Sequence, residues 1–223
     1  MNFMQLLQSL DNLLYEVMSW LVFFPITLWR TVSRPLQMME YADSELKDRP
    51  ERQYEDTLSP PLFLLLALLV SHSIGLAFGE GVNPIVASKT GLAAYIDSDG
   101  KLLLLRLVFF SIVPLMLAAA LLIGLRQPVT RERLKPPFYA QCYPAGAFAL
   151  ALGTSVLLMH DGPDRAKLVG GAMLVVTLAA YFSVQVAWFR RYLKRGLLVA
   201  TGYAAVALVG GMTFSIVFGL LFT

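Results

Sequence analysis

Residues 60–79 read PPLFLLLALLVSHSIGLAFG and decide the fold class. Two prolines open this stretch, at positions where the N–H groups of a helix have no intrahelical partner in any case. An almost unbroken apolar run follows, and a helix needs about 20 consecutive apolar residues to cross a bilayer. The stretch therefore predicts a transmembrane helix rather than a helix of a water-soluble domain.

Four more stretches of this kind follow toward the C-terminus, separated by short polar connectors. We expect spans at about residues 102–125, 138–159, 168–189 and 196–222. Of the 223 residues, 57% are hydrophobic and only 15% are charged, whereas a soluble domain usually carries about 25% charge. Residues 58–223 are thus predicted to form an all-α, polytopic membrane helix bundle of five transmembrane helices.

Residues 1–57 form a second region with a different pattern. Apolar residues recur at three- and four-residue steps through residues 6–21, between polar ones, which predicts an amphipathic helix. This helix ends near Trp29 and Arg30, residue types that are typical of the headgroup zone. We interpret it as lying in the interface, kinked or re-entrant at Pro25; a short sixth span is the alternative. Residues 40–57 are rich in acids and predict a solvated linker or a loose helical hairpin.

The distribution of Lys and Arg predicts the orientation in the membrane. With five spans, thirteen of the eighteen basic residues lie on one side, in the N-terminal segment and in the connectors after the second and fourth spans: Arg30, Arg34, Lys47, Arg49, Arg52, Arg126, Arg131, Arg133, Lys135, Arg190, Arg191, Lys194 and Arg195. Four lie on the other side (Lys89, Lys101, Arg165, Lys167) and one within a span. The positive-inside rule then makes the N-terminal segment cytoplasmic and the C-terminus external, as in a bacterial inner (plasma) membrane.

Several function classes are disfavoured by what the sequence contains. The net charge of +3 comes from basic residues beside the apolar runs, where topology explains them, so we expect no nucleic-acid partner. Cys142 is the only cysteine and lies in an apolar stretch, which predicts a buried structural thiol. The chain carries no P-loop, GxSxG, HExxH or CxxC pattern. We therefore expect a protein that is not an enzyme and that uses no metal or cofactor.

Two ionisable residues within the predicted spans are candidates for a binding or pathway role. His72 lies near the middle of the first span, where a charged form is costly, so it could handle a proton or a substrate. A neutral imidazole that bonds to a neighbouring helix is the structural alternative. Arg106 lies four residues inside the second span and could extend to the outer interface. Its other predicted role is to bind an anionic headgroup or substrate.

Other candidates are polar or small residues in apolar surroundings. Gln141, Tyr143 and Gln185 could line a narrow pathway, although hydrogen bonds between helices are the commoner role of such side chains. Glycines at six positions predict close helix packing, within the monomer or in a dimer: Gly75, Gly79, Gly170, Gly171, Gly210 and Gly211.

The layout resembles the Yip (Ypt-interacting protein) family. The likeness rests on five clustered spans after a cytoplasmic segment and on the Tyr143–Pro144 step that opens the third span in FYAQCYPAGAF. It implies a similar five-span fold without an enzyme signature. Eukaryotic relatives are tied to membrane traffic and its small GTPases, and bacterial ones are commonly called permease-like. This chain lacks a long soluble N-terminal region, so the resemblance transfers neither a GTPase partner nor any functional residue.

Two functions fit these patterns. The first is a permease-like or lipid-handling protein whose partners are membrane lipids, because mid-span prolines and glycines occur where helices bend around cavities. The second is a non-catalytic scaffold or accessory subunit of a larger membrane complex, or a homo-oligomer. A polar cavity around His72, Gln141 and Gln185 would favour transport, whereas a flat apolar strip in contact with another chain would favour the accessory role.

Overall fold

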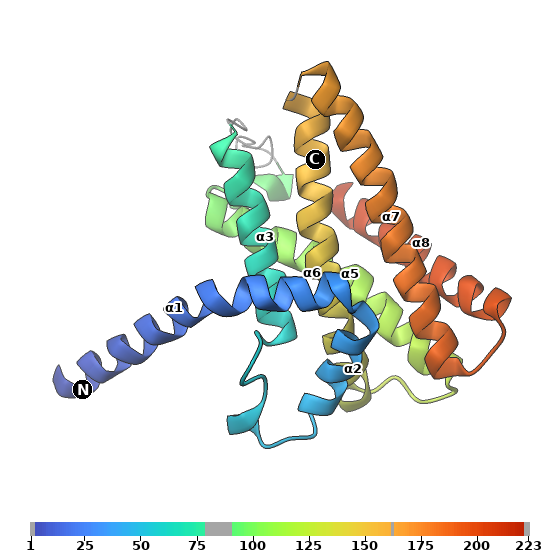
Figure 1. The fold of residues 1–223 in the computed structure, drawn as a ribbon, viewed down its shortest axis with the longest axis horizontal. Helices are drawn as coiled ribbons and strands as arrows, with labels where there is room; N and C mark the ends of the chain where they lie inside the picture. The colour runs from blue at the N-terminus through green and yellow to red at the C-terminus, as the bar shows by residue number, and fades with distance from the viewer. Residues whose placement is uncertain (1–2, 79–90, 162, 221–223) are drawn as a thin grey trace.

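The structure is a computed structural model that describes residues 3–78, 91–161 and 163–220. All the secondary structure in these ranges is helical (Figure 1): α1 (Phe3–Ser33), α2 (Pro35–Glu45), η1 (Pro50–Arg52), α3 (Pro60–Ala77), η2 (Gly91–Tyr95), α5 (Asp99–Gly124), α6 (Arg131–Asp161), α7 (Asp164–Leu193) and α8 (Leu197–Gly219). The predicted all-α class is confirmed. Helices long and apolar enough to cross a membrane confirm the coarse prediction of a multi-pass bundle.

The five predicted spans correspond to α3, α5, α6, α7 and α8. The observed bounds differ most from the predicted ones in α6, which begins at Arg131 rather than near residue 138. Pro136 and Pro137 fall inside this helix, and its backbone is helical through both. The segment Leu7–Ser33 of α1 also satisfies the length and composition of a span, so the described residues contain six candidates. It is the least apolar of them, with a mean hydropathy of 1.2 against 1.6 to 2.6 for the rest.

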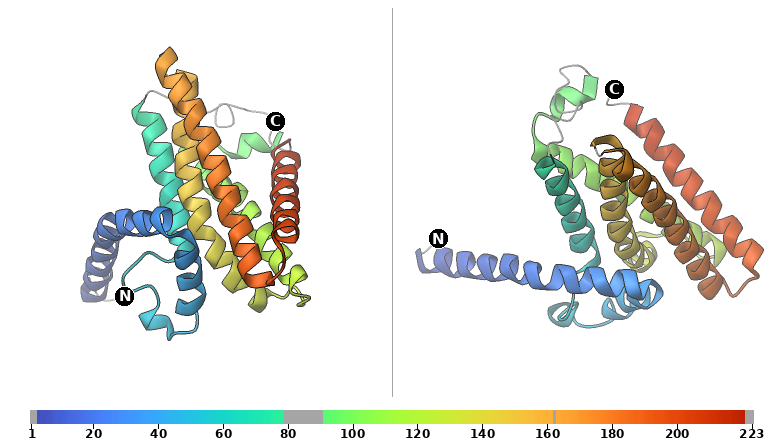
Figure 2. Two further views of the ribbon diagram at one scale, coloured as in Figure 1. Left: turned by 45° about the vertical axis from the view of Figure 1, so that its right-hand side comes forward. Right: turned by 45° about the horizontal axis from the view of Figure 1, so that its top comes forward.

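Helix α6 lies at the centre of the bundle and contacts α3, α5 and α7, while α8 packs against α5 and α7 (Figures 1 and 2). Glycines permit the closest of these contacts. A Cβ built on Gly146 of α6 would lie 2.8 Å from the Phe63 ring of α3. A Cβ built on Gly153 of α6 would collide with the hydroxyl of Ser71, which is on α3. These two glycines, seven residues apart on one face of α6, were not singled out from the sequence.

The six predicted packing glycines have different surroundings. Gly170 faces α6, where a Cβ would lie 2.8 Å from the Ser155 carbonyl oxygen, and Gly211 faces α5 at 3.2 Å from Val113. Gly210 has only an ordinary contact with Met116, and Gly171 has open space beside it. Gly75 is buried within α3, and Gly79 lies outside the described residues.

The N-terminal region is more ordered than a solvated linker. Residues 35–45 form α2, which packs on α6 through the buried side chains of Met38, Met39 and Ala42. Helix α1 continues through Pro25 and runs crosswise to α3 and α6, with its N-terminal half projecting beyond the bundle (Figures 1 and 2). Most side chains of α1 are exposed in the isolated chain, but in its C-terminal half Thr27 and Thr31 are buried against the bundle.

The connectors alternate between the two ends of the bundle. Helix α2, the α5–α6 connector and the α7–α8 connector lie at one end, and the α6–α7 turn lies at the other (Figure 1). The connectors that were grouped by their Lys and Arg content therefore share one end of the molecule, which we call the basic end. We call the end that holds the α6–α7 turn and the start of α5 the opposite end.

Candidate functional site

His72 and Arg106 meet between α3 and α5. The Nη1 group of Arg106 donates a hydrogen bond to Nδ1 of His72 over 3.2 Å. His72 is buried and Arg106 is half-buried. The carboxylate of Asp99, in the first turn of α5, has Oδ1 at 3.9 Å from His72 Nε2, which is too long for a hydrogen bond. Three ionisable residues from two helices thus form one cluster near the opposite end.

This geometry fixes the tautomer of His72. A guanidinium group only donates hydrogen bonds, so Nδ1 must offer its lone pair and the proton must lie on Nε2. Nε2 has no hydrogen-bond partner among the described residues and is buried, so the cluster contains one buried donor with its bonding capacity unused.

Gln141 and Gln185 form a second polar pair, between α6 and α7. The Nε2 group of Gln141 donates to Oε1 of Gln185 over 2.8 Å, and neither side chain is exposed. The other amide atoms of both residues, and Nε1 of the nearby Trp188 on α7, have no partner among the described residues. The hydrogen bond between Gln141 and Gln185 therefore links α6 and α7 within a group of buried polar side chains that also includes Trp188.

Tyr143 has a structural position next to these residues. Its hydroxyl, buried in α6, donates to the backbone carbonyl of Leu58 over 2.7 Å. The backbone N–H of Leu58 in turn donates to Oγ1 of Thr27 on α1 over 3.1 Å. Tyr143 thus joins the segment before α3, and through it α1, to the centre of the bundle.

The segment before α3 is also held at the basic end, by a cluster of ion pairs and hydrogen bonds around Asp56. The carboxylate of Asp56 accepts hydrogen bonds from the Tyr41 hydroxyl at 2.6 Å and from Arg30 at 2.7 Å. These two donors, with Tyr41 contributing most, hold the pKa of Asp56 below its ordinary value. Arg191 of α7 pairs with Glu40 of α2 at 2.5 Å. The contacts join α1, α2 and α7 through residues that belong to the acid-rich stretch.

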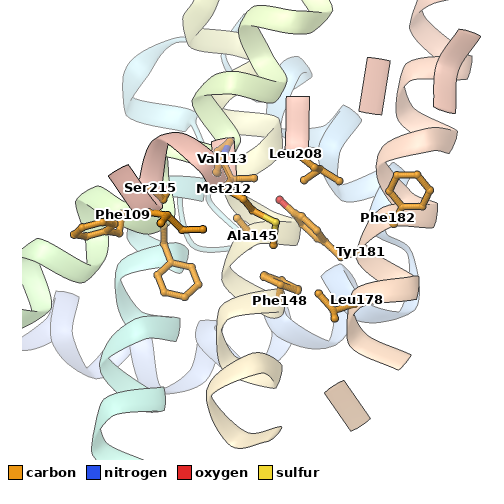
Figure 3. A pocket seen from close by; sticks show the side chains of 13 residues that line it. Phe109, Val113, Ala145, Phe148, Leu178, Tyr181, Phe182, Leu208, Met212 and Ser215 are labelled. Carbon is orange, nitrogen blue, oxygen red and sulfur yellow. The ribbon is translucent and has the colours of Figure 1, made fainter. Parts of the chain in front are cut away.

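An apolar cavity of about 520 Å³ lies between α5, α6, α7 and α8. Its lining is almost entirely aromatic and aliphatic, as Figure 3 shows: Phe109, Phe110, Val113, Pro114, Ala145, Phe148, Leu178, Tyr181, Phe182, Leu208, Met212, Ser215 and Ile216. Tyr181 stacks on Phe148 with ring centroids 4.5 Å apart. Its hydroxyl points toward the space between Leu208 and Met212 (Figure 3). The cavity has the size of a small-molecule site and offers a ligand very few polar groups.

The five predicted site residues therefore fall at three places. His72 pairs with Arg106 toward the opposite end, Gln141 pairs with Gln185 nearer the basic end, and Tyr143 binds the N-terminal segment. None of them lines the cavity. The aromatic residues that do were missed, because most positions of a membrane span are apolar whether they face lipid or the bundle, and the sequence gives no sign of which of them face inward. Ser215, a polar residue in an apolar stretch, was a signal that could have indicated this cavity.

The described residues contain no group of three or more His, Cys, Asp or Glu side chains that could hold a metal ion. Comparison of the chain with models of protein families, with curated proteins and with solved structures found no match. The resemblance to the Yip family therefore stays a prediction, and a function must be inferred from the geometry of the chain itself.

Proposed function

We propose that this chain is a non-enzymatic, lipid-handling membrane protein that holds the hydrocarbon part of a membrane-soluble molecule in the cavity between α5 and α8. The observation that supports this most directly is the lining of that cavity. It consists of apolar side chains on four helices, with the Tyr181 hydroxyl and Ser215 as polar groups. Ser215 already donates its proton to the Gly211 carbonyl, so the Tyr181 hydroxyl is left as the hydrogen-bond donor for a ligand.

The position of the polar residues favours this function over a permease for a polar solute. A pathway for such a solute needs polar side chains that follow one another across the membrane. His72 and Arg106 lie on the α3–α5 side, whereas Gln141 and Gln185 lie between α6 and α7. The cavity touches neither pair. An acyl or isoprenoid chain would need none of these groups.

The same proposal includes a topology of five spans with α1 in the interface. The low hydropathy of α1, its crosswise direction and its Trp20, Trp29 and Arg30 side chains support a position at headgroup level (Figure 1). The Lys and Arg distribution supports a cytoplasmic basic end in a bacterial inner membrane.

An accessory subunit of a larger membrane complex is the second candidate. It is favoured by α1, whose N-terminal half projects from the bundle with apolar side chains such as Leu10 and Leu13 exposed. The mass of the protein particle in mild detergent, measured by light scattering, separates the two. A single copy without other proteins supports the first candidate, and a stable larger assembly supports the second.

Photo-crosslinking tests the proposed function. The purified chain in lipid nanodiscs is supplied with phosphatidylcholine that carries a diazirine on one acyl chain, and the labelled residues are mapped by mass spectrometry. We expect labels on inward-facing residues such as Phe148 and Tyr181, and we expect Met212→Trp to reduce them by reducing the free volume. Val206→Trp, on the same helix but 75% exposed and outside the cavity lining, is the control. Labels confined to outward-facing residues such as Val176 would contradict the proposal.

A further inference from the structure

Two members of the polar cluster, Arg106 and Asp99, lie on α5, which also forms part of the cavity wall, and the third, His72, lies on α3. Arg106 and Phe110 are four residues apart on α5 and so lie on one face, about 6 Å apart along the axis. Phe110 lines the cavity. Because a helical side chain leans toward the N-terminus of its helix, Arg106 reaches from this face toward the end of α5 that begins at Asp99. Arg106 is therefore about one helical turn from the apolar cavity.

The cluster presents donors from two helices. Arg106 uses Nη1 for the one hydrogen bond it makes among the described residues, and a guanidinium carries five N–H groups in a planar fork that suits an oxyanion. His72 adds the N–H of Nε2, which is buried and has no hydrogen-bond partner in the described part of the chain. Within a membrane such a donor is costly to leave unpaired, so it favours an acceptor that comes from outside the bundle.

Asp99 indicates which kind of acceptor the site accommodates. Its carboxylate oxygen lies 3.9 Å from the His72 donor, and its side chain is 64% exposed. An oxyanion is thus already directed at this donor, although not at hydrogen-bonding distance. A ligand oxyanion could take the shorter position while Asp99 turns toward the exterior, where it is solvated. Asp99 is then a competitor of the ligand rather than a part of its binding site.

We propose that Arg106 and His72 bind the oxyanionic headgroup of an amphiphile whose hydrocarbon chain occupies the cavity between α5 and α8. This inference rests on the proposed lipid-handling function, to which it adds the chemical class of the ligand. The phosphate diester of a phospholipid and the carboxylate of a fatty acid share the required chemistry. The headgroup lies toward the opposite end, and Arg106 and His72 determine selectivity for the anion.

Binding of four probes to the purified full-length chain, followed by native mass spectrometry in detergent, tests the inference. The probes are dioleoylphosphatidylglycerol, oleate, dioleoylglycerol, which has the same chains without an oxyanion, and inorganic phosphate, which has no chain. We expect Arg106→Gln to weaken binding of at least one of the two anionic lipids about tenfold, as for the loss of one charge-assisted hydrogen bond. Binding of dioleoylglycerol should not change.

Two further variants keep the test independent of a folding defect in Arg106→Gln. Asp99→Asn removes the competing carboxylate and should tighten binding of the same anionic lipid, an effect that a purely structural cluster would not produce. Lys101→Gln is the matched control, because Lys101 carries the same charge at the same end of α5 but pairs with Asp97 at 2.7 Å. It should leave all affinities unchanged.

The outcomes separate this inference from the proposed function. One outcome is that dioleoylglycerol and the anionic lipids bind saturably and that neither Arg106→Gln nor Asp99→Asn changes their affinities. This outcome would overturn the headgroup site but not the proposed function. An equal loss of dioleoylglycerol binding in Arg106→Gln would also overturn the headgroup site, because the cluster would then only support the fold. Failure of dioleoylglycerol to bind, together with phosphate binding that requires Arg106, would instead contradict the chain-binding cavity.

Discussion

Replacement of Gly146 by alanine tests how tightly α3 and α6 pack at the centre of the bundle. A Cβ at this position would lie 2.8 and 2.9 Å from two carbons of the Phe63 ring and 3.3 Å from the Leu64 Cα. Ordinary contacts between carbon atoms are about 3.5–4.0 Å. Phe63 is fully buried between the rings of Phe24 and Tyr143, whose centroids lie 5.5 and 5.7 Å away. The ring therefore cannot move aside without displacing both neighbours.

The expected cost follows from this geometry. Overpacking of a close-packed site lowers the free energy of unfolding by about 1–3 kcal/mol. Alanine also favours a helix over glycine by up to about 1 kcal/mol, which offsets part of the loss. Gly171→Ala provides the matched control, because a Cβ on Gly171 meets no atom within 4 Å. The helix-propensity gain is common to both variants, so Gly146→Ala should be about 1–3 kcal/mol less stable than Gly171→Ala.

Unfolding by SDS in mixed micelles, monitored by circular dichroism, measures this difference. We expect the midpoint of Gly146→Ala to fall clearly below that of Gly171→Ala, and the midpoint of Gly171→Ala to equal or exceed that of the wild type. Equal midpoints for the two variants would refute the close contact between α3 and α6.

Two further predictions concern the segment before α3. The pKa of Asp56 is lowered in the folded chain by Tyr41 and Arg30, so its contribution to stability is complete above the unfolded value near pH 4 and is lost as pH falls through the folded pKa. The protection of this segment against hydrogen exchange, relative to the intrinsic exchange rate at each pH, should therefore fall below about pH 4 in the wild type, and Asp56→Asn should remove this dependence. Tyr143→Phe should lower the free energy of unfolding by about 1–3 kcal/mol and speed proteolysis near Leu58, because the buried Leu58 carbonyl loses its donor.

Neighbouring residues give the controls for these two variants. Glu55→Gln changes an exposed carboxylate next to Asp56 and should leave the pH dependence of exchange as it is in the wild type. Tyr203→Phe removes the hydroxyl of a half-buried tyrosine on α8 and should have a smaller effect on unfolding than Tyr143→Phe. A Tyr143→Phe variant as stable and as protease-resistant as Tyr203→Phe would show that the Leu58 contact contributes nothing.

The spans could be predicted from the sequence because their length and lack of charge are imposed by the bilayer. Helix α2 was predicted only in part: a loose helical hairpin was one of two expectations for residues 40–57, but the acidic residues concealed that Met38, Met39 and Ala42 pack on the bundle. The packing of α2 on α6 explains why these three residues are buried although acidic residues lie beside them in the same helix.

The candidate site was predictable only residue by residue. His72 and Arg106 each stood out as ionisable groups in apolar stretches, but their pairing depends on the relative register of α3 and α5, which one sequence does not specify. The same holds for Gln141 and Gln185, on facing turns of α6 and α7. The cavity could not be predicted at all, because Phe109 and Phe148 resemble the lipid-facing residues around them.

The central claim is that five helices cross the membrane while α1 lies along its cytoplasmic surface. Single cysteines at Gln8, Arg165 and Arg195, introduced into a Cys142→Ser chain, can be labelled with a membrane-impermeant maleimide in intact spheroplasts and after lysis. We predict that Arg165→Cys reacts in intact spheroplasts and that Gln8→Cys and Arg195→Cys react only after lysis. Labelling of Gln8→Cys before lysis would make α1 a sixth span, and labelling of Arg195→Cys before lysis would invert the topology; either result would contradict the claim.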